Sequence, residues 1–370
     1  MTSEPAGARP DTDVRTPEPG PEHERSARLR RRLAWWAVIA CAPYLMLKLL
    51  WVVGVDVGVV DGADINRTKW VVGNLLTFLM DGTAALIAHT LTKPRVGRGR
   101  AWPVVLPMWV ATGLLGVIML AVPLTCVAAL VTDGHNPFVT DDLLYGWVYA
   151  VVYAGFIVEG TVLVGAFVLY ANERWGGFLR ARVRDLPPLG GRVPVRAAAL
   201  TAALLMTVSA TLHLIWAAGS SLGMTDQWIA ERDADGYWLD CTEGVLAAAG
   251  AVGLVVLALR IGRGRVRTPL ALAWLGTGGV FGWGGWMALI VSTSSSESPI
   301  VQRTSTLLGV VYTAEMIIGL LALTAGWYAL SRYTALYAAR EQRDAAAAPG
   351  TGGLPDGSSP LPSSAGIPAA

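Results

Sequence analysis

Long apolar segments recur along the chain and are separated by short polar stretches. Eight of them stand out, at about 33–55, 71–92, 102–131, 144–171, 197–219, 239–259, 269–291 and 307–330. An α-helix of about 20 apolar residues spans the roughly 30 Å of hydrocarbon in a bilayer. Polar residues form no regular stripe within the segments, which is typical of helices that are apolar nearly all round. The pattern therefore predicts eight transmembrane helices.

The overall composition indicates the same class of protein. Of the 370 residues, 53% are hydrophobic and 15% are charged, which is too apolar for an ordinary soluble domain. We therefore expect an all-α integral membrane protein whose first partner is the lipid bilayer.

The distribution of basic residues predicts which helix ends face the cytoplasm. Four Lys or Arg occur in the loops that follow odd-numbered segments, at 56–70, 132–143, 220–240 and 292–306. Another 22 occur in the remaining flanks and loops, at 25–32, 93–101, 172–196, 260–268 and 331–343. By the positive-inside rule, both termini are cytoplasmic and the protein is a multi-pass protein of the plasma membrane. Short loops leave no room for a nucleic-acid-reading domain, so no nucleic-acid partner is expected.

Both ends of the chain and one internal loop lack the apolar content of a packed core. Residues 1–25 are rich in Pro, Glu, Arg and Thr without an apolar run, which predicts a disordered tail and not a cleavable signal peptide. Residues 344–370 are rich in Gly, Pro, Ser and Ala and predict a second disordered tail. The Arg-rich stretch 172–196 is expected to be a cytoplasmic linker because it contains the turn-rich L-P-P-L-G-G.

The linker separates two stretches of sequence that share a pattern. The ladder Lys48-x2-Trp51-x2-Gly54-x3-Gly58 recurs 165 residues later as His213-x2-Trp216-x2-Gly219-x3-Gly223. A Trp-x-x-Thr-Gly pattern at Trp109 recurs at Trp274 with the same offset. The chain is therefore predicted to be a duplication of two four-helix repeats, 26–171 and 197–343. Because each repeat has an even number of spans, the two share one orientation and form a parallel repeat.

In its second copy, the ladder His-x-x-Trp-x-x-Gly-x-x-x-Gly resembles the opening helix of an actinobacterial membrane-protein family, domain of unknown function 3995. Proteins of that family typically have four spans, so the resemblance implies a four-helix unit, as the duplication does. The first half departs from the family pattern because Lys48 stands where the family has His. The resemblance brings no activity with it. The high Ala, Gly, Arg and Val content looks like that of a protein from a high-GC actinobacterium.

Ionisable residues inside the apolar segments are the candidates for function. They are Lys48, Asp81, Glu159, His213, Glu243 and Glu315. A charge at the bilayer centre costs at least about 2.5–3.5 kcal/mol, so such residues face the bundle interior or water. Trp216 joins them because it lies three residues after His213 on the same helix face. The sequence thus predicts an outward-facing polar pocket, or two equivalent ones.

Three interpretations of these residues remain open. In the first, the pocket binds a small molecule or a lipid, in a transport or accessory role. In the second, His213 with Glu243 or Glu315 performs acid–base chemistry on a lipid or isoprenoid-like substrate. In the third, the pairs Lys48–Asp81 and His213–Glu243 only set helix registry. The sequence shows no metal-ligand spacing, nucleotide motif or nucleophile motif, so no metal, cofactor or catalytic residue is assigned.

Other apolar-segment residues are expected to have structural roles. Trp51 and Trp216 lie near the outer helix ends, where anchoring at the membrane interface is the commonest role of Trp. The Gly-rich run 276–285 predicts close helix packing. Cys41 and Cys126 are expected to pack as small hydrophobic residues.

The topology predicts a labelling pattern. A cysteine introduced into the 220–240 loop should react with a membrane-impermeant thiol reagent in intact cells, because this loop carries few basic residues and is expected outside. A cysteine placed in 172–196 is the control and should react only after permeabilisation. The reverse pattern would contradict the predicted orientation.

Overall fold

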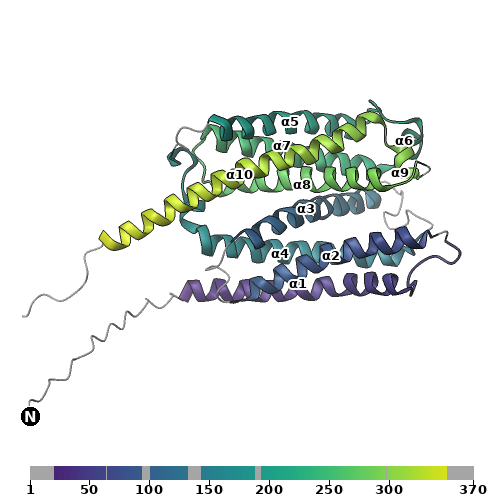
Figure 1. The fold of residues 1–370 in the computed structure, drawn as a ribbon, viewed down its shortest axis with the longest axis horizontal. Coiled ribbons are helices and arrows are strands. Elements are labelled where there is room, and N and C mark those ends of the chain that lie inside the picture. Colours follow the sequence, from purple (N-terminus) through teal and green to yellow (C-terminus); the bar gives the residue numbers. More distant parts are fainter. Residues whose placement is uncertain are drawn as a thin grey trace, which may run out of the picture.

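The computed structural model describes residues 21–63, 65–93, 101–131, 143–187, 193–296 and 298–347. These residues form helices and their connecting segments and contain no named strand. The chain begins and ends its described part at the same end of an elongated bundle (Figure 1). The elements are α1 (Pro21–Val53), α2 (Arg67–Thr92), α3 (Trp102–Val131), α4 (Gly146–Arg180), η2 (Val183–Asp185), α5 (Val193–Ala217), α6 (Asp226–Glu231), α7 (Ala234–Leu259), α8 (Arg267–Thr293), α9 (Pro299–Arg303) and α10 (Thr306–Ala347).

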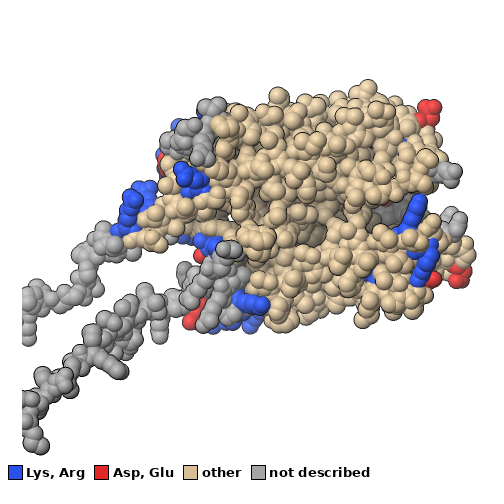
Figure 2. Space-filling view, viewed as in Figure 1, with Lys and Arg blue, Asp and Glu red and all other residues tan. Residues whose placement is uncertain are grey.

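Seven of these helices are long and apolar enough to cross a membrane, namely α1, α2, α3, α4, α5, α7 and α10. The expectation of an all-helical, multi-pass membrane protein is therefore confirmed. The remaining long helix, α8, has 27 residues and contains six glycines and three tryptophans, which add little to a hydropathy average. On the face drawn in Figure 2, charged side chains gather at the two ends of the bundle and the band between them has none.

Two groups of helices lie side by side and meet at the centre of the bundle. In the first half of the chain, α1 packs against α2 and α4, and in the second half α5 packs against α7 and α10. The contact between the halves is made mainly by α3 and α8 (Figure 1).

Reciprocal hydrogen bonds join α3 to α8. The indole nitrogen of Trp109 donates to Thr277 Oγ1 at 3.1 Å, and that of Trp274 donates to Thr112 Oγ1 at 2.8 Å. Each tryptophan thus donates to the threonine of the other helix, and such reciprocal contacts are typical of two surfaces related by a two-fold axis. Beside them, a Cβ built on Gly113 would lie only 2.1 Å from the backbone oxygen of Gly278. The two backbones thus touch at a point where no side chain fits.

Glycine also closes the contact between α7 and α8. A Cβ on Gly250 would lie 2.8 Å from the Cα of Gly276, and one on Gly253 would lie 2.5 Å from the backbone of α8. Small residues let membrane helices approach closely and gain dispersion contacts. The interpretation of the Gly-rich run as a packing surface is confirmed.

The repeated Trp-x-x-Gly pattern ends α1 and α5. Gly54 and Gly219 both adopt φ +99°, the left-handed conformation that commonly terminates a helix and that glycine adopts without strain. The chain then turns back, so the indole nitrogens of Trp51 and Trp216 donate to carbonyl oxygens six residues onward at 2.8 and 2.9 Å. The two tryptophans are 2% and 0% exposed. Their interpretation as interface anchors is therefore wrong, because these hydrogen bonds hold them inside the protein.

Several helices run further than the apolar segments that predicted them. α1 begins at Pro21, inside the expected 1–25 tail, and α4 continues to Arg180, inside the expected linker 172–196. Arg30 and Glu173 join these two extensions through an ion pair of 3.0 Å. Helical hydrogen bonding continues past the apolar run where packing and ion pairs hold the extra turns. α10 likewise reaches Ala347, and the tail residues 1–20 and 348–370 lie outside the described part of the chain.

The α3–α8 contact predicts a difference between two glycines one helical turn apart. Gly113→Ala should lower the free energy of unfolding by about 1–3 kcal/mol, because the added methyl group would overlap the α8 backbone. Gly116→Ala is the matched control, since a Cβ there meets no atom within 4 Å. Denaturant titration in mixed micelles measures both changes. Equal stability of the two variants would contradict the close contact.

Candidate functional site

The second half of the chain gathers a histidine and three acids at one point. His213 of α5 has its Nδ1 atom 2.8 Å from Asp240 Oδ1 and 3.3 Å from Glu243 Oε2, both on α7. Its Nε2 atom lies 3.0 Å from Glu315 Oε1 on α10. Ser209, one turn before His213, donates to the same Glu315 oxygen. The prediction that His213 lies within reach of Glu243 or Glu315 is confirmed, and we name these five residues the histidine cluster.

Arg232 joins the histidine cluster to the end of α5. Its guanidinium contacts Asp240 Oδ2 and donates to the carbonyl oxygen of Trp216 at 3.0 Å. It therefore balances one acid of the cluster and satisfies a carbonyl group at the end of a helix. The ring of Trp216 meets that of His213 edge-on, with centroids 5.2 Å apart.

Sequence reasoning missed Asp240 and Arg232 because both were placed in an outer loop. A signal was present, because Asp233 is a typical N-cap residue. Its side chain caps α7 by accepting hydrogen bonds from the backbone N–H groups of Asp235 and Gly236. A helix that begins there carries Asp240 and Glu243 on one face, because they are three residues apart.

The first half places a lysine where the second half has its histidine. The ammonium of Lys48 donates to Asn74 Oδ1 at 2.8 Å and lies 4.8 and 4.9 Å from the ring centroids of Tyr44 and Trp51. The expected direct pair of Lys48 with Asp81 is replaced by the bond to Asn74, which lies two turns nearer to the start of α2. The amide and the two aromatic rings stabilise the cation in place of a carboxylate.

Asp81 of α2 meets Glu159 of α4 in the interior of the first half. These two side chains, here called the acid pair, are 6% and 1% exposed as whole residues. Cys41, Asp81 and Glu159 each offer a possible metal-ligating atom, and these three atoms lie within 4.8 Å of one another. One buried oxygen of each acid, Asp81 Oδ2 and Glu159 Oε2, has no hydrogen-bond partner among the described residues. A buried polar atom without a partner costs free energy that a further contact would recover, and Arg232 Nε in the second half is another such atom.

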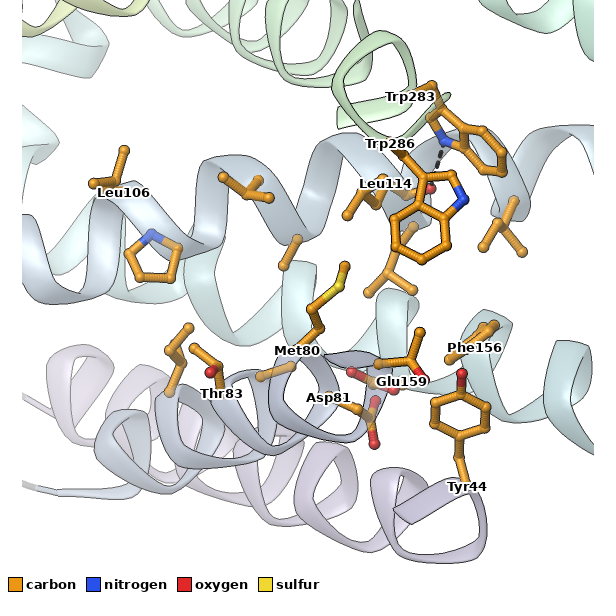
Figure 3. A pocket seen from close by; sticks show the side chains of 18 residues that line it. Tyr44, Met80, Asp81, Thr83, Leu106, Leu114, Phe156, Glu159, Trp283 and Trp286 are labelled. Carbon is orange, nitrogen blue, oxygen red and sulfur yellow. Dashed lines mark hydrogen bonds between the residues drawn. The ribbon is translucent and has the colours of Figure 1, made fainter. Parts of the chain in front are cut away.

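The acid pair lines a cavity of about 470 Å³ between α2 and α3. Figure 3 shows Asp81, Glu159 and Tyr44 on one side of the cavity and Trp283 and Trp286 of α8 on the other. Most of the remaining lining is apolar, and it includes Thr77, Met80, Thr83, Ala84, Ile87, Leu106, Pro107, Val110, Ala111, Leu114, Leu115, Ile118 and Phe156. Trp283 donates to the Leu114 carbonyl oxygen at 3.2 Å, which ties this wall to α3.

The cavity reaches the side of the bundle. Met80 and Leu106 line it and are 37% and 38% exposed, and Thr83 between them is also exposed. These residues belong to the apolar band of the surface, so the opening faces sideways between helices. Figure 2 shows a recess between the two halves on the face drawn there.

The seven residues predicted to form a pocket fall into separate environments. Asp81 and Glu159 line the large cavity, whereas Lys48 binds Asn74 beside it. His213, Trp216, Glu243 and Glu315 belong to or pack against the histidine cluster. Glu243 and Glu315 border a cavity of only about 10 Å³. The polar side chains of the second half are thus packed together, whereas the acid pair of the first half borders open space.

Comparison with known proteins adds no relative, since no family model, curated protein or solved structure matches the chain significantly. The class of protein therefore follows from the fold, which is that of a multi-pass helical membrane protein. Any function has to be argued from the acid pair with its cavity and from the histidine cluster.

The environments of two arginines predict different effects on stability. Arg232→Met should lower the free energy of unfolding by about 3–5 kcal/mol, because it leaves Asp240 without its cation in a buried cluster. Arg67→Met is the matched control, since Arg67 donates to the Trp51 carbonyl oxygen but pairs with Asp56 at an exposed position. The Arg232 and Arg67 side chains are 3% and 45% exposed, so the control should cost only about 0–1 kcal/mol. Equal losses of unfolding free energy in denaturant titrations would show that the buried Arg232–Asp240 pair stabilises the fold no more than the exposed Arg67–Asp56 pair does.

Proposed function

We propose that the protein is a plasma-membrane protein that binds an amphipathic small molecule or lipid between α2 and α3, in a transport or accessory role. The observation that carries this proposal is the acid pair, whose unpartnered oxygens belong to side chains that line a large and otherwise apolar cavity. A ligand with an apolar body and a hydrogen-bond-donating or cationic group matches both features.

The cavity has the size and lining of a ligand site. Its volume of about 470 Å³ lies within the range of about 300–1,000 Å³ that is usual for small-molecule pockets. An amine or a hydroxyl group of the ligand would meet the acid pair, and a hydrocarbon portion would pack against Leu115, Ile118 and Phe156. The exposed rim lets such a ligand enter from the bilayer.

The proposed topology has eight spans, in which α8 joins the seven long apolar helices as the seventh span in chain order, arranged as two parallel four-helix repeats with cytoplasmic termini. α8 supports this topology because it packs against α3, α7 and α10 along the same bundle. The repeat is supported by equivalent geometry at the ends of α1 and α5 and by the reciprocal α3–α8 hydrogen bonds. The basic loops, and the start of α1 and the end of α10 at the same end of the bundle, support the orientation (Figure 1).

The second half is a poorer candidate for a ligand site. The cavity beside Glu243 and Glu315 has room for about one water molecule, and glycine packing closes the space between α7 and α8. An organic substrate for acid–base catalysis by His213 does not fit there, which favours the cavity beside the acid pair.

Native mass spectrometry of the purified protein tests the proposal. We expect a co-purified amphiphile on the wild-type protein and its loss in Ala111→Phe, because the added ring would occupy the cavity. Val127→Phe is the matched control on the same helix, where the side chain is 59% exposed, and it should keep the amphiphile.

The acid pair is tested in the same experiment. Asp81→Asn with Glu159→Gln should reduce occupancy at least about tenfold, as expected when about 1.4 kcal/mol of charge-assisted hydrogen bonding is lost. Wild-type protein that binds no more amphiphile than Ala111→Phe would contradict the proposal.

A further inference from the structure

The geometry of the histidine cluster points to a metal site. We propose that His213 Nδ1, Asp240 Oδ1 and Glu243 Oε2 bind one divalent transition-metal ion of the kind represented by Zn²⁺ and Mn²⁺. The spacing of ligand types along the sequence shows no such site, because the donors come from two helices and are brought together only by the packing of α5 on α7.

The separations of the three donor atoms match those around one metal ion. Nδ1 of His213 lies 2.8 Å from Asp240 Oδ1 and 3.3 Å from Glu243 Oε2, and each of the three side chains offers a ligand atom within 4.8 Å of the other two. Nitrogen and oxygen ligands bind zinc at about 2.0–2.2 Å, which places neighbouring ligands of one ion about 3–3.5 Å apart. Small side-chain shifts therefore convert the observed arrangement into a coordination sphere.

A single proton on Nδ1 meets the same arrangement only in part. The Nδ1 atom of His213 faces carboxylate oxygens of both Asp240 and Glu243, and an N–H group at this atom has one hydrogen to donate. A metal ion bonds the imidazole nitrogen and both carboxylates at once. It also offsets charge in a cluster that has three carboxyl groups beside one guanidinium.

The surrounding residues hold each donor in an orientation suited to metal binding. Glu315 lies 3.0 Å from His213 Nε2, so it accepts the proton of that nitrogen and leaves the Nδ1 lone pair for the metal. Arg232 contacts the second oxygen of Asp240 and leaves Oδ1 for the metal. Carboxylate–histidine–metal arrangements of this kind orient ligands in metal sites generally. The small cavity beside Glu243 has room for a water molecule as a further ligand.

The first half of the chain supplies a natural comparison. At the equivalent ladder position it carries Lys48, whose ammonium brings its own positive charge and binds Asn74. An ammonium group has no lone pair for a metal, whereas an imidazole has one. His213→Lys therefore introduces a side chain that this ladder already accommodates, and it replaces the proposed nitrogen ligand by a positive charge.

The experiment uses full-length protein purified in detergent, stripped with a chelator and dialysed against ZnCl₂ or MnCl₂ alone. Elemental analysis should give one ion bound per wild-type chain, and the ion should raise the melting temperature. His213→Lys and Glu243→Gln should bind the ion at least about tenfold more weakly, because each lacks a ligand. Glu315→Gln should weaken binding by about 10–100-fold, as loss of an orienting carboxylate generally does.

Two controls separate this site from other carboxylates. Glu231→Gln changes an acid on α6 that pairs with Arg303, and it should retain the ion. Cys41→Ser should also retain it, which excludes the donors near the acid pair as the binding site. Wild-type binding no tighter than that of His213→Lys, or loss of the ion in Cys41→Ser, would overturn the proposal. Neither result depends on whether the α2–α3 cavity binds an amphiphile.

Discussion

The cost of burying an unpaired charge among apolar helices is the constraint on which the interior of this protein depends. Every ionisable group inside the bundle has to meet an opposite charge, a hydrogen-bond partner or a ligand. The two halves answer this constraint differently. In the second half, His213 and Arg232 stand among three acids, and in the first half Lys48 binds an amide while the acid pair keeps two oxygens without partners.

This difference is coupled to how closely the helices pack. Between α7 and α8, Gly250 and Gly276 bring the backbones together, so side chains of α5, α7 and α10 enclose the histidine cluster. Between α2 and α3 no such contact closes the space, and the acid pair borders a cavity instead. The second half thus gathers its ionisable groups in one closely packed cluster, whereas the acid pair of the first half borders a cavity, although the two halves share the pattern that ends α1 and α5.

The contact between α3 and α8 relates the two sites to each other. Trp283 belongs to the second half, but it forms a wall of the cavity in the first half and hydrogen-bonds to α3. Gly284 on the same helix packs against Glu315 of the histidine cluster. α8 therefore contacts both sites, and its position depends on the glycine contact with Gly113.

The sequence by itself determined the features that depend on local patterns. Runs of apolar residues predicted the long helices, and the repeated ladder located the ends of α1 and α5. The cost of a buried charge also predicted that His213 would meet Glu243 or Glu315, because each group needs a partner at a similar depth.

The tertiary structure alone decided which partners are chosen and where space remains. Asp240 was assigned to a loop. In the structure α7 begins at Ala234, after the N-cap Asp233, and therefore includes Asp240. The burial of Trp51 and Trp216 follows from the turn after each helix, and Lys48 binds Asn74 because of how α1 and α2 are rotated. Hydropathy describes how apolar a helix is but not its rotation about its own axis. The partner that a carboxylate meets depends on that rotation and on the contacts between segments distant in the sequence, as at His213, Asp240 and Glu315.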